Sequence, residues 1–147
     1  MIFAFGHSER ERIEVDVLGY ERAPVGEYFD DNWLTVDIRV QAGGFHGVAS
    51  AAILTGELVG FASQLRPLFE KLSGSAQFST MEGQLTLSLV GDGKGHIELR
   101  GEVLDQAGIG NSLHFSLEFD QSQLGTSIRE LEKVMSQFPV RGHQMTL

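Results

Sequence analysis

The 147-residue sequence has no cysteine, only three prolines and a single tryptophan. Without cysteine there can be no disulfide framework, no zinc–thiolate site and no cysteine nucleophile. The absence is also typical of proteins in a reducing compartment. No apolar run approaches the roughly 20 residues that span a bilayer, and Met1 to Gly6 lack the basic leader and cleavage signature of a signal peptide. We therefore expect a soluble, cytoplasmic protein.

Basic residues are also scarce, since 11 Lys and Arg face 20 Asp and Glu and the net charge is −9. Nucleic acids and anionic membrane surfaces attract positive charge, so the balance argues against both as partners. Residues 9–37 hold nine acids and three arginines, which is −6 of the total. This segment is either a solvated face that keeps the protein soluble or a surface that steers a basic partner.

Motifs that carry chemistry are missing as well. None of the five histidines (His7, His46, His96, His114 and His143) has the spacing of a metal site. The glycine-rich run from Gly91 to Gly95 lacks the P-loop pattern, and a strand rather than a helix follows it. Neither a Gly-x-Ser-x-Gly elbow nor a His-Glu-x-x-His motif is present. We predict no catalytic residue, no metal ligand and no cofactor, and hence a protein that is not an enzyme.

Alternating apolar and polar residues predict strands in both halves of the chain. In the first half, Leu34, Val36, Ile38 and Val40 share one face, Gly43-Gly44 supplies a turn, and a strand returns from about Phe45 to Leu54. Residues 21–32, with Pro24 and Gly26, are typical of a loop. The second half reads as a meander of four strands ending near Asp120. Because the connections are short, neighbouring strands should be antiparallel.

Two amphipathic helices follow these strand groups. The first carries apolar residues at spacings of 3 and 4 from Leu58 to Leu72, with Thr55 as the expected N-cap and Gly74 as the terminator. Pro67 predicts a kink or a restarted helix. The second begins near Ser122, where Asp120 and Gln123 have the spacing of a capping box, and Pro139 ends it.

These elements predict one α+β domain over residues 1–147, in which an antiparallel β-sheet carries two amphipathic helices in the order ββββα-ββββα. Residues 139–147 should form a loose tail. A shift of 66 residues places Leu58 on Leu124 and Leu65 on Leu131. The match indicates either a duplication or two helices that obey the same packing rules.

Several positions together resemble a known family. They are Trp33 at a strand start; Gly43, Gly44, Phe45 and Gly47 around a turn; Leu58, Phe61 and Leu65 in the first helix; Phe78, Ser79, Glu82 and Leu85; Gly95, His96 and Ile97; and Phe119, Asp120, Gln121, Ser122 and Leu124. Over roughly residues 32–138 the chain resembles the WapI family of bacterial immunity proteins. The resemblance implies a small intracellular antidote to a contact-delivered toxin domain.

Our hypothesis is therefore an immunity-type protein that binds and neutralises a cognate toxin domain, as a monomer or weak dimer. A toxin that acts on nucleic acid needs a basic surface, which an acidic face would complement. The predicted contact residues are Glu27, Asp30, Asp31 and Asp37, because they lie in a loop or on a polar strand face. Two alternatives stay open: a small-ligand-binding domain with a sheet-walled cavity, and a small enzyme that works through carboxylates and His96.

Overall fold

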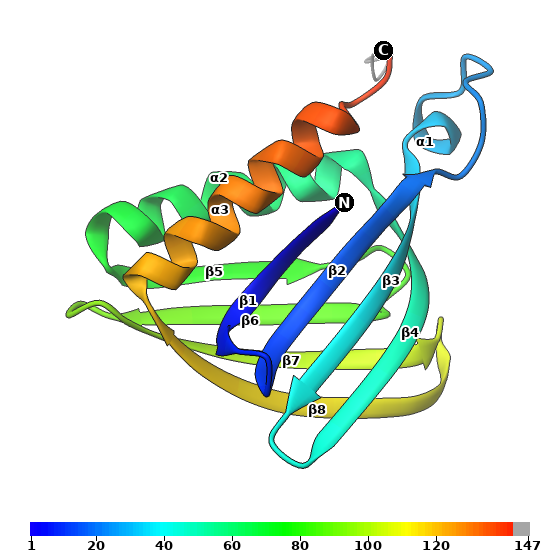
Figure 1. Ribbon diagram of the computed structural model, residues 1–147. Helices are drawn as coiled ribbons and strands as arrows, with labels where there is room; N and C mark the ends of the chain where they lie inside the picture. Colours follow the sequence, from blue (N-terminus) through cyan, green and yellow to red (C-terminus); the bar gives the residue numbers. More distant parts are fainter. Residues whose placement is uncertain (143–147) are drawn as a thin grey trace.

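The structure, a computed structural model, describes residues 1–142 and contains two four-stranded antiparallel sheets and three helices. The first sheet has the order β1 (Ile2–Ser8), β2 (Glu11–Tyr20), β3 (Trp33–Ala42), β4 (Phe45–Leu54). The second has the order β5 (Ser73–Ser79), β6 (Leu85–Asp92), β7 (His96–Gln106), β8 (Ile109–Asp120). The helices are α1 (Tyr28–Asp31), α2 (Thr55–Lys71) and α3 (Gln121–Gln137) (Figure 1). The predicted α+β class and element order are confirmed, and α1 is an addition within the expected loop.

The inner faces of the two sheets share one apolar core. Ile13, Val15 and Val17 on β2 lie opposite Val40, Ile38 and Val36 on β3, and all six side chains are buried. Leu85, Leu87 and Leu89 supply the matching face of the second sheet. The intervening residues point to the opposite face of each strand, which is why the sequence alternates.

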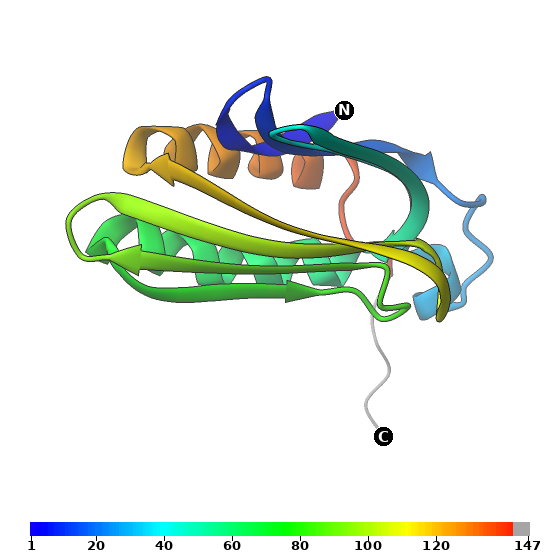
Figure 2. The same cartoon turned by 90° about the horizontal axis from the view of Figure 1, so that it is seen from below.

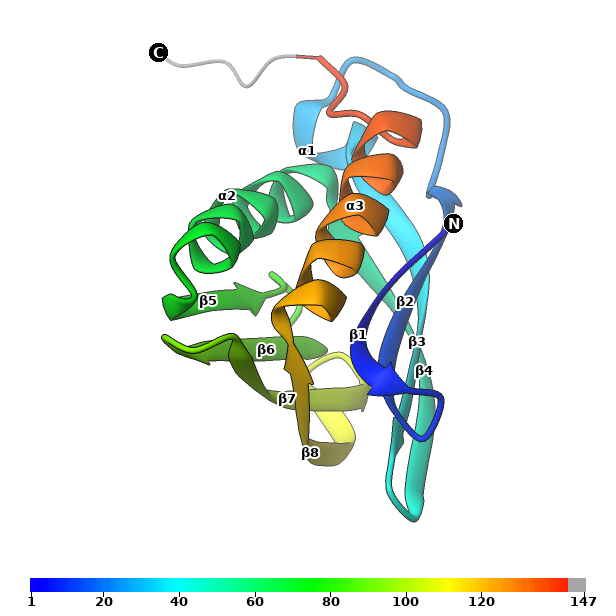
Figure 3. The ribbon, with the colours of Figure 1, turned by 60° about the vertical axis from the view of Figure 1, so that its left-hand side comes forward.

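Helices α2 and α3 lie side by side where the two sheets splay apart (Figures 1 and 3). Seen from below, α2 runs along the second sheet and α3 along the first (Figure 2). Phe61 and Leu65 of α2 and Leu124 and Leu131 of α3 are completely or almost completely buried. The helices thereby close the core on the side of β1 and β5.

The ends of α2 differ from the predictions. Leu54 is the N-cap rather than Thr55, and its N–H donates to the Glu57 carboxylate at 2.8 Å. The Thr55 hydroxyl instead donates to Oδ1 of Asn32, 2.7 Å away. The helix continues through Pro67 because the neighbouring Leu65 and Leu68 are buried in the core. It ends at Leu72, which has the left-handed conformation expected of Gly74 (φ 62°).

The predicted start of α3 is confirmed, one residue earlier than expected. The Asp120 side chain accepts from the N–H of Gln123, and the Gln123 side chain accepts from the N–H of Asp120, both at 3.0 Å. The two bonds satisfy groups that a helix N-terminus leaves without an intrahelical partner. Of the helices within residues 1–142, none combines the length and apolar character needed to cross a membrane.

Each long helix also seals the edge strand beside it. On α2, the side-chain amide of Gln64 accepts from the N–H of Gln77 at 2.9 Å and donates to its carbonyl at 3.0 Å. On α3, the Glu130 carboxylate accepts from the N–H of Ala4 at 3.1 Å, and the Ser127 hydroxyl donates to the Ala4 carbonyl. The backbone groups at the edges of β5 and β1 are thus bonded at these positions instead of being open to another chain.

We expect Gln64→Ala to lower the free energy of unfolding by about 1 kcal/mol, because two backbone groups of Gln77 lose their partner and return to water. Urea denaturation of the variant and the parent protein measures the difference. Ser63→Ala is the matched control, since the Ser63 hydroxyl bonds only within its own helix, to the carbonyl of Gly60. Equal stability of the Gln64 variant and the parent would show that the seal contributes nothing.

Candidate functional site

The four predicted contact acids fall in two places. Glu27, Asp30 and Asp31 lie together, at and just before α1, whereas Asp37 lies on the outer face of β3. Asp37 is four residues beyond the start of that strand, which is roughly 13 Å along it. Glu27 and Asp30 are exposed, and Asp30 pairs with Arg22 at 3.1 Å. The structure therefore brings three of the four residues together.

Asp31 has an internal role that the sequence did not indicate. Its side chain is only 5% exposed, and its two carboxylate oxygens accept from the N–H groups of Val25 and Gly26, each at 2.9 Å. These bonds, led by the one from Val25, hold the pKa of the Asp31 carboxyl below its ordinary value of 3.8, although burial opposes them. Because both oxygens bond to loop backbone and the side chain is covered, Asp31 holds the loop in shape.

The buried amide of Asn32 is a second anchor, which the sequence analysis missed. Nδ2 of Asn32 donates to the carbonyls of Tyr28 and Arg141, at 2.6 and 2.9 Å. Its Oδ1 accepts from the N–H of Arg141 at 2.8 Å and from the Thr55 hydroxyl. The available signal was the Asp-Asn pair, since such side chains bond to nearby backbone. Asn32 thus joins α1, the start of α2 and the chain after α3.

The first residues of the expected loose tail are held in the same place. The Tyr20 hydroxyl donates to the Pro139 carbonyl, and the Arg141 guanidinium lies 3.2 Å from the centre of the Tyr20 ring, a cation–π contact. Phe138 packs edge-on against the same ring. The rest of the tail, residues 143–147 with His143, lies outside the described residues. Residues 139–141 thus help to fix the chain around Asn32.

Residues 21–31, here called the anchored loop, present apolar and acidic side chains together. Val25 is 65% exposed and Phe29 is 51% exposed. The Val25 N–H donates to the Asp31 carboxylate, and the Phe29 carbonyl accepts from the backbone N–H of Asn32. Glu21, Glu27 and Asp30 are exposed around them. An apolar side chain on rigid backbone loses little conformational entropy when it is bound. The loop therefore has the properties of a protein contact surface.

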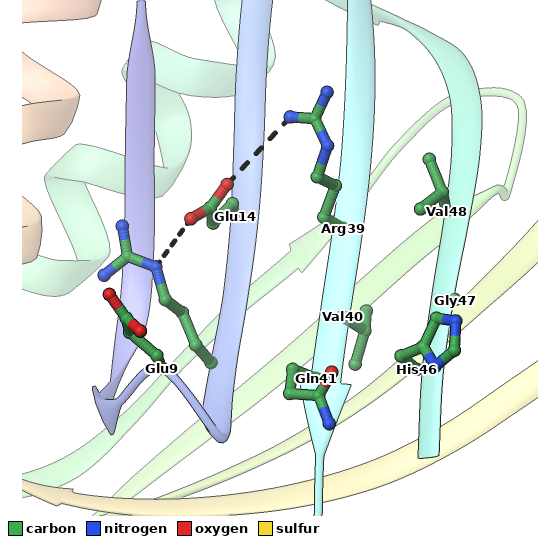
Figure 4. Close-up of a pocket in the computed structure, with 9 residues that line it drawn as sticks. Glu9, Glu14, Arg39, Val40, Gln41, His46, Gly47 and Val48 are labelled. Carbon is green, nitrogen blue, oxygen red and sulfur yellow. Dashed lines mark hydrogen bonds and ion pairs between the residues drawn. The ribbon is translucent and has the colours of Figure 1, made fainter.

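The outer face of the first sheet carries a network of charges. Arg12 pairs with Glu14 at 2.8 Å, and Glu14 lies 4.0 Å from Arg39 (Figure 4). Arg39 also lies 3.7 Å from Asp16 and 3.9 Å from Asp37. Asp16 and Asp37 are directly opposite each other on β2 and β3, an arrangement of like charges that is destabilising. Arg39 lies close to both and offsets their repulsion.

Beside this network is an open hollow of about 260 Å³ on the outer face of the sheet, here called the outer hollow (Figure 4). It is lined by Glu9, Arg12, Glu14, Arg39, Val40, Gln41, His46, Gly47 and Val48. Of the two carboxylates that line the hollow, Glu14 is paired with Arg12. His46 is the only histidine in the lining. The hollow therefore offers no pair of buried carboxylates for acid–base chemistry.

His96, the candidate of the enzyme alternative, lies elsewhere. Its Nε2 is 3.6 Å from the Glu118 carboxylate on the outer face of the second sheet, and the His96 side chain is half exposed. His114 has a similar exposed position, 3.4 Å from Glu102. Within residues 1–142, no three His, Asp or Glu side chains are grouped so that they could hold a metal ion. These positions give no support to the carboxylate–histidine alternative.

Comparison with known proteins gave a family match over nearly the whole chain. The model of a family described as "Immunity protein WapI-like family" matches residues 3–139. A search of curated proteins found no match. Among solved structures, "trypanosoma bruciei MRP1/MRP2" is similar at 14% sequence identity and a TM-score of 0.48, over 94% of this chain and 86% of that chain.

We expect Asp31→Asn to unfold at a lower temperature than the parent at pH 7, because a neutral amide holds the N–H groups of Val25 and Gly26 less strongly. The folded-state pKa of Asp31 is lowered, so its contribution is present above pH 3.8 and is lost as the pH falls through the folded value. Thermal denaturation followed by circular dichroism should show the deficit shrinking towards pH 3. Asp30→Asn, which changes an exposed side chain nearby, should have little effect at either pH.

We expect Arg39→Ala to lower the free energy of unfolding by about 0.5–1 kcal/mol at low salt, because the Asp16–Asp37 repulsion is no longer offset. The loss should shrink in about 1 M salt, which screens exposed charges. Arg66→Ala is the control, since it removes an equally exposed arginine from a single pair with Glu132. A loss that is the same at both salt concentrations would contradict the electrostatic explanation.

Proposed function

Because the chain belongs to the immunity protein WapI-like family, we propose that it binds a cognate toxin domain and neutralises it. The match over residues 3–139 is the observation that carries the proposal, since it includes both sheets and α3. Membership also suggests a role that is not enzymatic. Neutralisation then requires only that the chain occupies the surface the toxin needs.

The charge of the chain supports a basic partner. A net charge of −9 attracts a toxin domain that carries basic residues in order to act on nucleic acid. The attraction mainly speeds encounter and disfavours wrong partners. We further propose that the protein acts in the cytoplasm, where such a toxin would meet its target, and that it is a monomer or weak dimer before it binds.

The anchored loop is our proposed steering surface, together with Asp37 on β3. Its exposed acids Glu27 and Asp30 are the predicted contact residues that remain accessible in the loop. Val25 and Phe29 add exposed apolar area beside these acids. Apolar anchors surrounded by charged residues are the usual composition of protein interfaces.

Co-expression tests the proposal directly. The gene immediately upstream is expected to encode a large secreted protein with a variable C-terminal toxin domain. Cells that express this domain should survive only when the present chain is also expressed, and the two purified proteins should form a complex. The immunity role is wrong if the chain neither binds the domain nor rescues the cells.

Reversing the charge of the exposed loop acids should slow association. We expect Glu27→Lys combined with Asp30→Lys to reduce the association rate roughly tenfold at low salt and to flatten its salt dependence, because the local field is reversed. Surface plasmon resonance over a salt series measures both effects. The control is Glu70→Lys combined with Glu82→Lys, which makes the same change in net charge at exposed positions elsewhere. Identical rates for the two double variants would move the steering surface away from the loop.

A further inference from the structure

The two sheets have four outer edges, which differ in whether helix side chains bond to their backbone. The edges of β1 and β5 are sealed by side chains of α3 and α2, as described above. Helix side chains bond to β4 and β8 only at their last residues, Leu54 and Asp120, where the helices begin, and no helix side chain within residues 1–142 bonds to the rest of either edge. An unsealed edge presents N–H and C=O groups that can pair with another strand.

The direction of the β4 backbone follows from one hydrogen bond. The Ser50 carbonyl accepts from Nε2 of Gln84 at 3.0 Å, so the backbone groups of Ser50 point away from β3. Pairing of β4 with β3 is unbroken from Phe45 to Leu54. Since the direction alternates with a period of two, the N–H and C=O groups of Val48 and His46 also point outward.

The side chains of β4 leave this edge accessible. Phe45–Ser50 contains no Asp, Glu, Lys or Arg, and Val48 is 62% exposed. Each open edge carries an exposed histidine, His46 on β4 and His114 on β8, but β8 also carries the exposed Glu118. Charged residues on an edge strand oppose pairing with another chain. Of the two unsealed edges, β4 is therefore the one suited to accept a strand.

A groove of about 220 Å³ runs beside the same edge, between the two sheets, and we call it the β4 groove. Ala49, Val103 and Leu113 give it apolar walls, and Asp105 and Asn111 of the β7–β8 hairpin form its far side. Gly47 leaves it open, because a Cβ atom there would lie 3.4 Å from the Leu113 side chain. With β4 on one side and the hairpin on the other, the groove has the form needed by a single extended chain.

We propose that an extended segment of the neutralised toxin domain adds to Phe45–Ala49 of β4 as a fifth strand of the first sheet. This proposal rests on the proposed function. The main chain of the segment bonds to His46 and Val48, and its alternate apolar side chains enter the β4 groove. Its other side chains lie on the outer face of the sheet, beside His46 and Val48.

A second copy of this chain is a poorer occupant for two reasons. Each copy carries a charge of −9, so two copies repel, whereas a basic partner is attracted. A second copy that paired through its own β4 would also press the rest of its first sheet against the β7–β8 hairpin of this chain. The toxin segment avoids both problems, because it belongs to a partner of opposite charge and enters as a single strand.

Val48→Pro tests the proposal. Proline removes the outward N–H of Val48 without breaking a bond to β3, and edge strands tolerate proline where the N–H faces solvent. Gly47 precedes it and has no Cβ to clash with the proline ring. We expect the dissociation rate from the toxin domain to rise at least tenfold while the association rate and the melting temperature change little. Val48→Thr, which keeps the N–H and the branched side chain, should bind like the parent.

Ser116→Pro on β8 is the matched control. The N–H of Leu104 donates to the Gln84 carbonyl at 2.9 Å. In this register the backbone N–H and C=O groups of even-numbered β7 residues therefore point to β6, and those of odd-numbered residues point to β8. The backbone groups of Phe115, the partner of Gly101, then point to β7, and those of Ser116 point away from it. Ser116→Pro therefore changes an outward N–H on the other open edge and should leave toxin binding unchanged.

Amide hydrogen exchange in the complex supplies a readout that needs no variant. The N–H of Val48 should exchange more slowly when the toxin domain is bound, whereas that of Ser116 should not. A parent protein that does not bind the toxin domain overturns the proposed function and the strand addition together. The strand addition alone is overturned if the parent binds the toxin domain, the Val48→Pro variant binds equally well, and the Val48 amide is not protected in the complex. It is also overturned by a Val48→Pro variant that converts a dimer to a monomer without changing toxin binding.

Discussion

The unpaired backbone groups at the edges of the two sheets set a constraint that the long helices of this fold meet with their side chains. A sheet can bury one face against a core, but the outer strand still carries N–H and C=O groups that need partners. Gln64 meets this need for β5, and Glu130 with Ser127 meets it for β1. Buried apolar residues of α2 and α3 place these helices where the sheets splay apart, and the same helices then supply the edge bonds. The remaining edges, β4 and β8, lead directly into α2 and α3 and have no such helix bond along the rest of their length within residues 1–142.

Local patterns in the sequence predicted the elements, while contacts between distant residues decided the details. Alternation was sufficient for β2 and β3 because their inner residues are buried and their outer residues are charged. The capping box of Asp120 and Gln123 is local, so it was predicted correctly. Thr55 was assigned the wrong role because its partner, Asn32, lies 23 residues earlier. Asp30 and Asp31 are neighbours of one residue type, and only the folded loop distinguishes the exposed carboxylate from the buried one. The family resemblance was confirmed, because it used turn glycines and core positions that the fold requires.

Charge and backbone pairing have separable physical effects in the proposed complex. Acids around the anchored loop act over a distance comparable to the Debye length of about 8 Å at physiological salt, so they affect encounter more than dissociation. Hydrogen bonds along β4 form only after contact, so they affect how long the complex lasts. The two surfaces can therefore change independently, and a change in partner sequence need not disturb the residues that steer association. Asp31 and Asn32 keep the loop in place throughout, since they bond to the protein's own backbone.

The two long helices begin 66 residues apart, at Thr55 and Gln121, and their edge-sealing residues Gln64 and Glu130 keep the same spacing. Packing rules alone do not require this shared hydrogen-bonding role, so it favours duplication of a ββββα unit. The helix of the first unit seals the opening strand of the second, and the helix of the second seals the opening strand of the first. A single unit could not satisfy its own first strand in this way, whereas two identical units could satisfy each other.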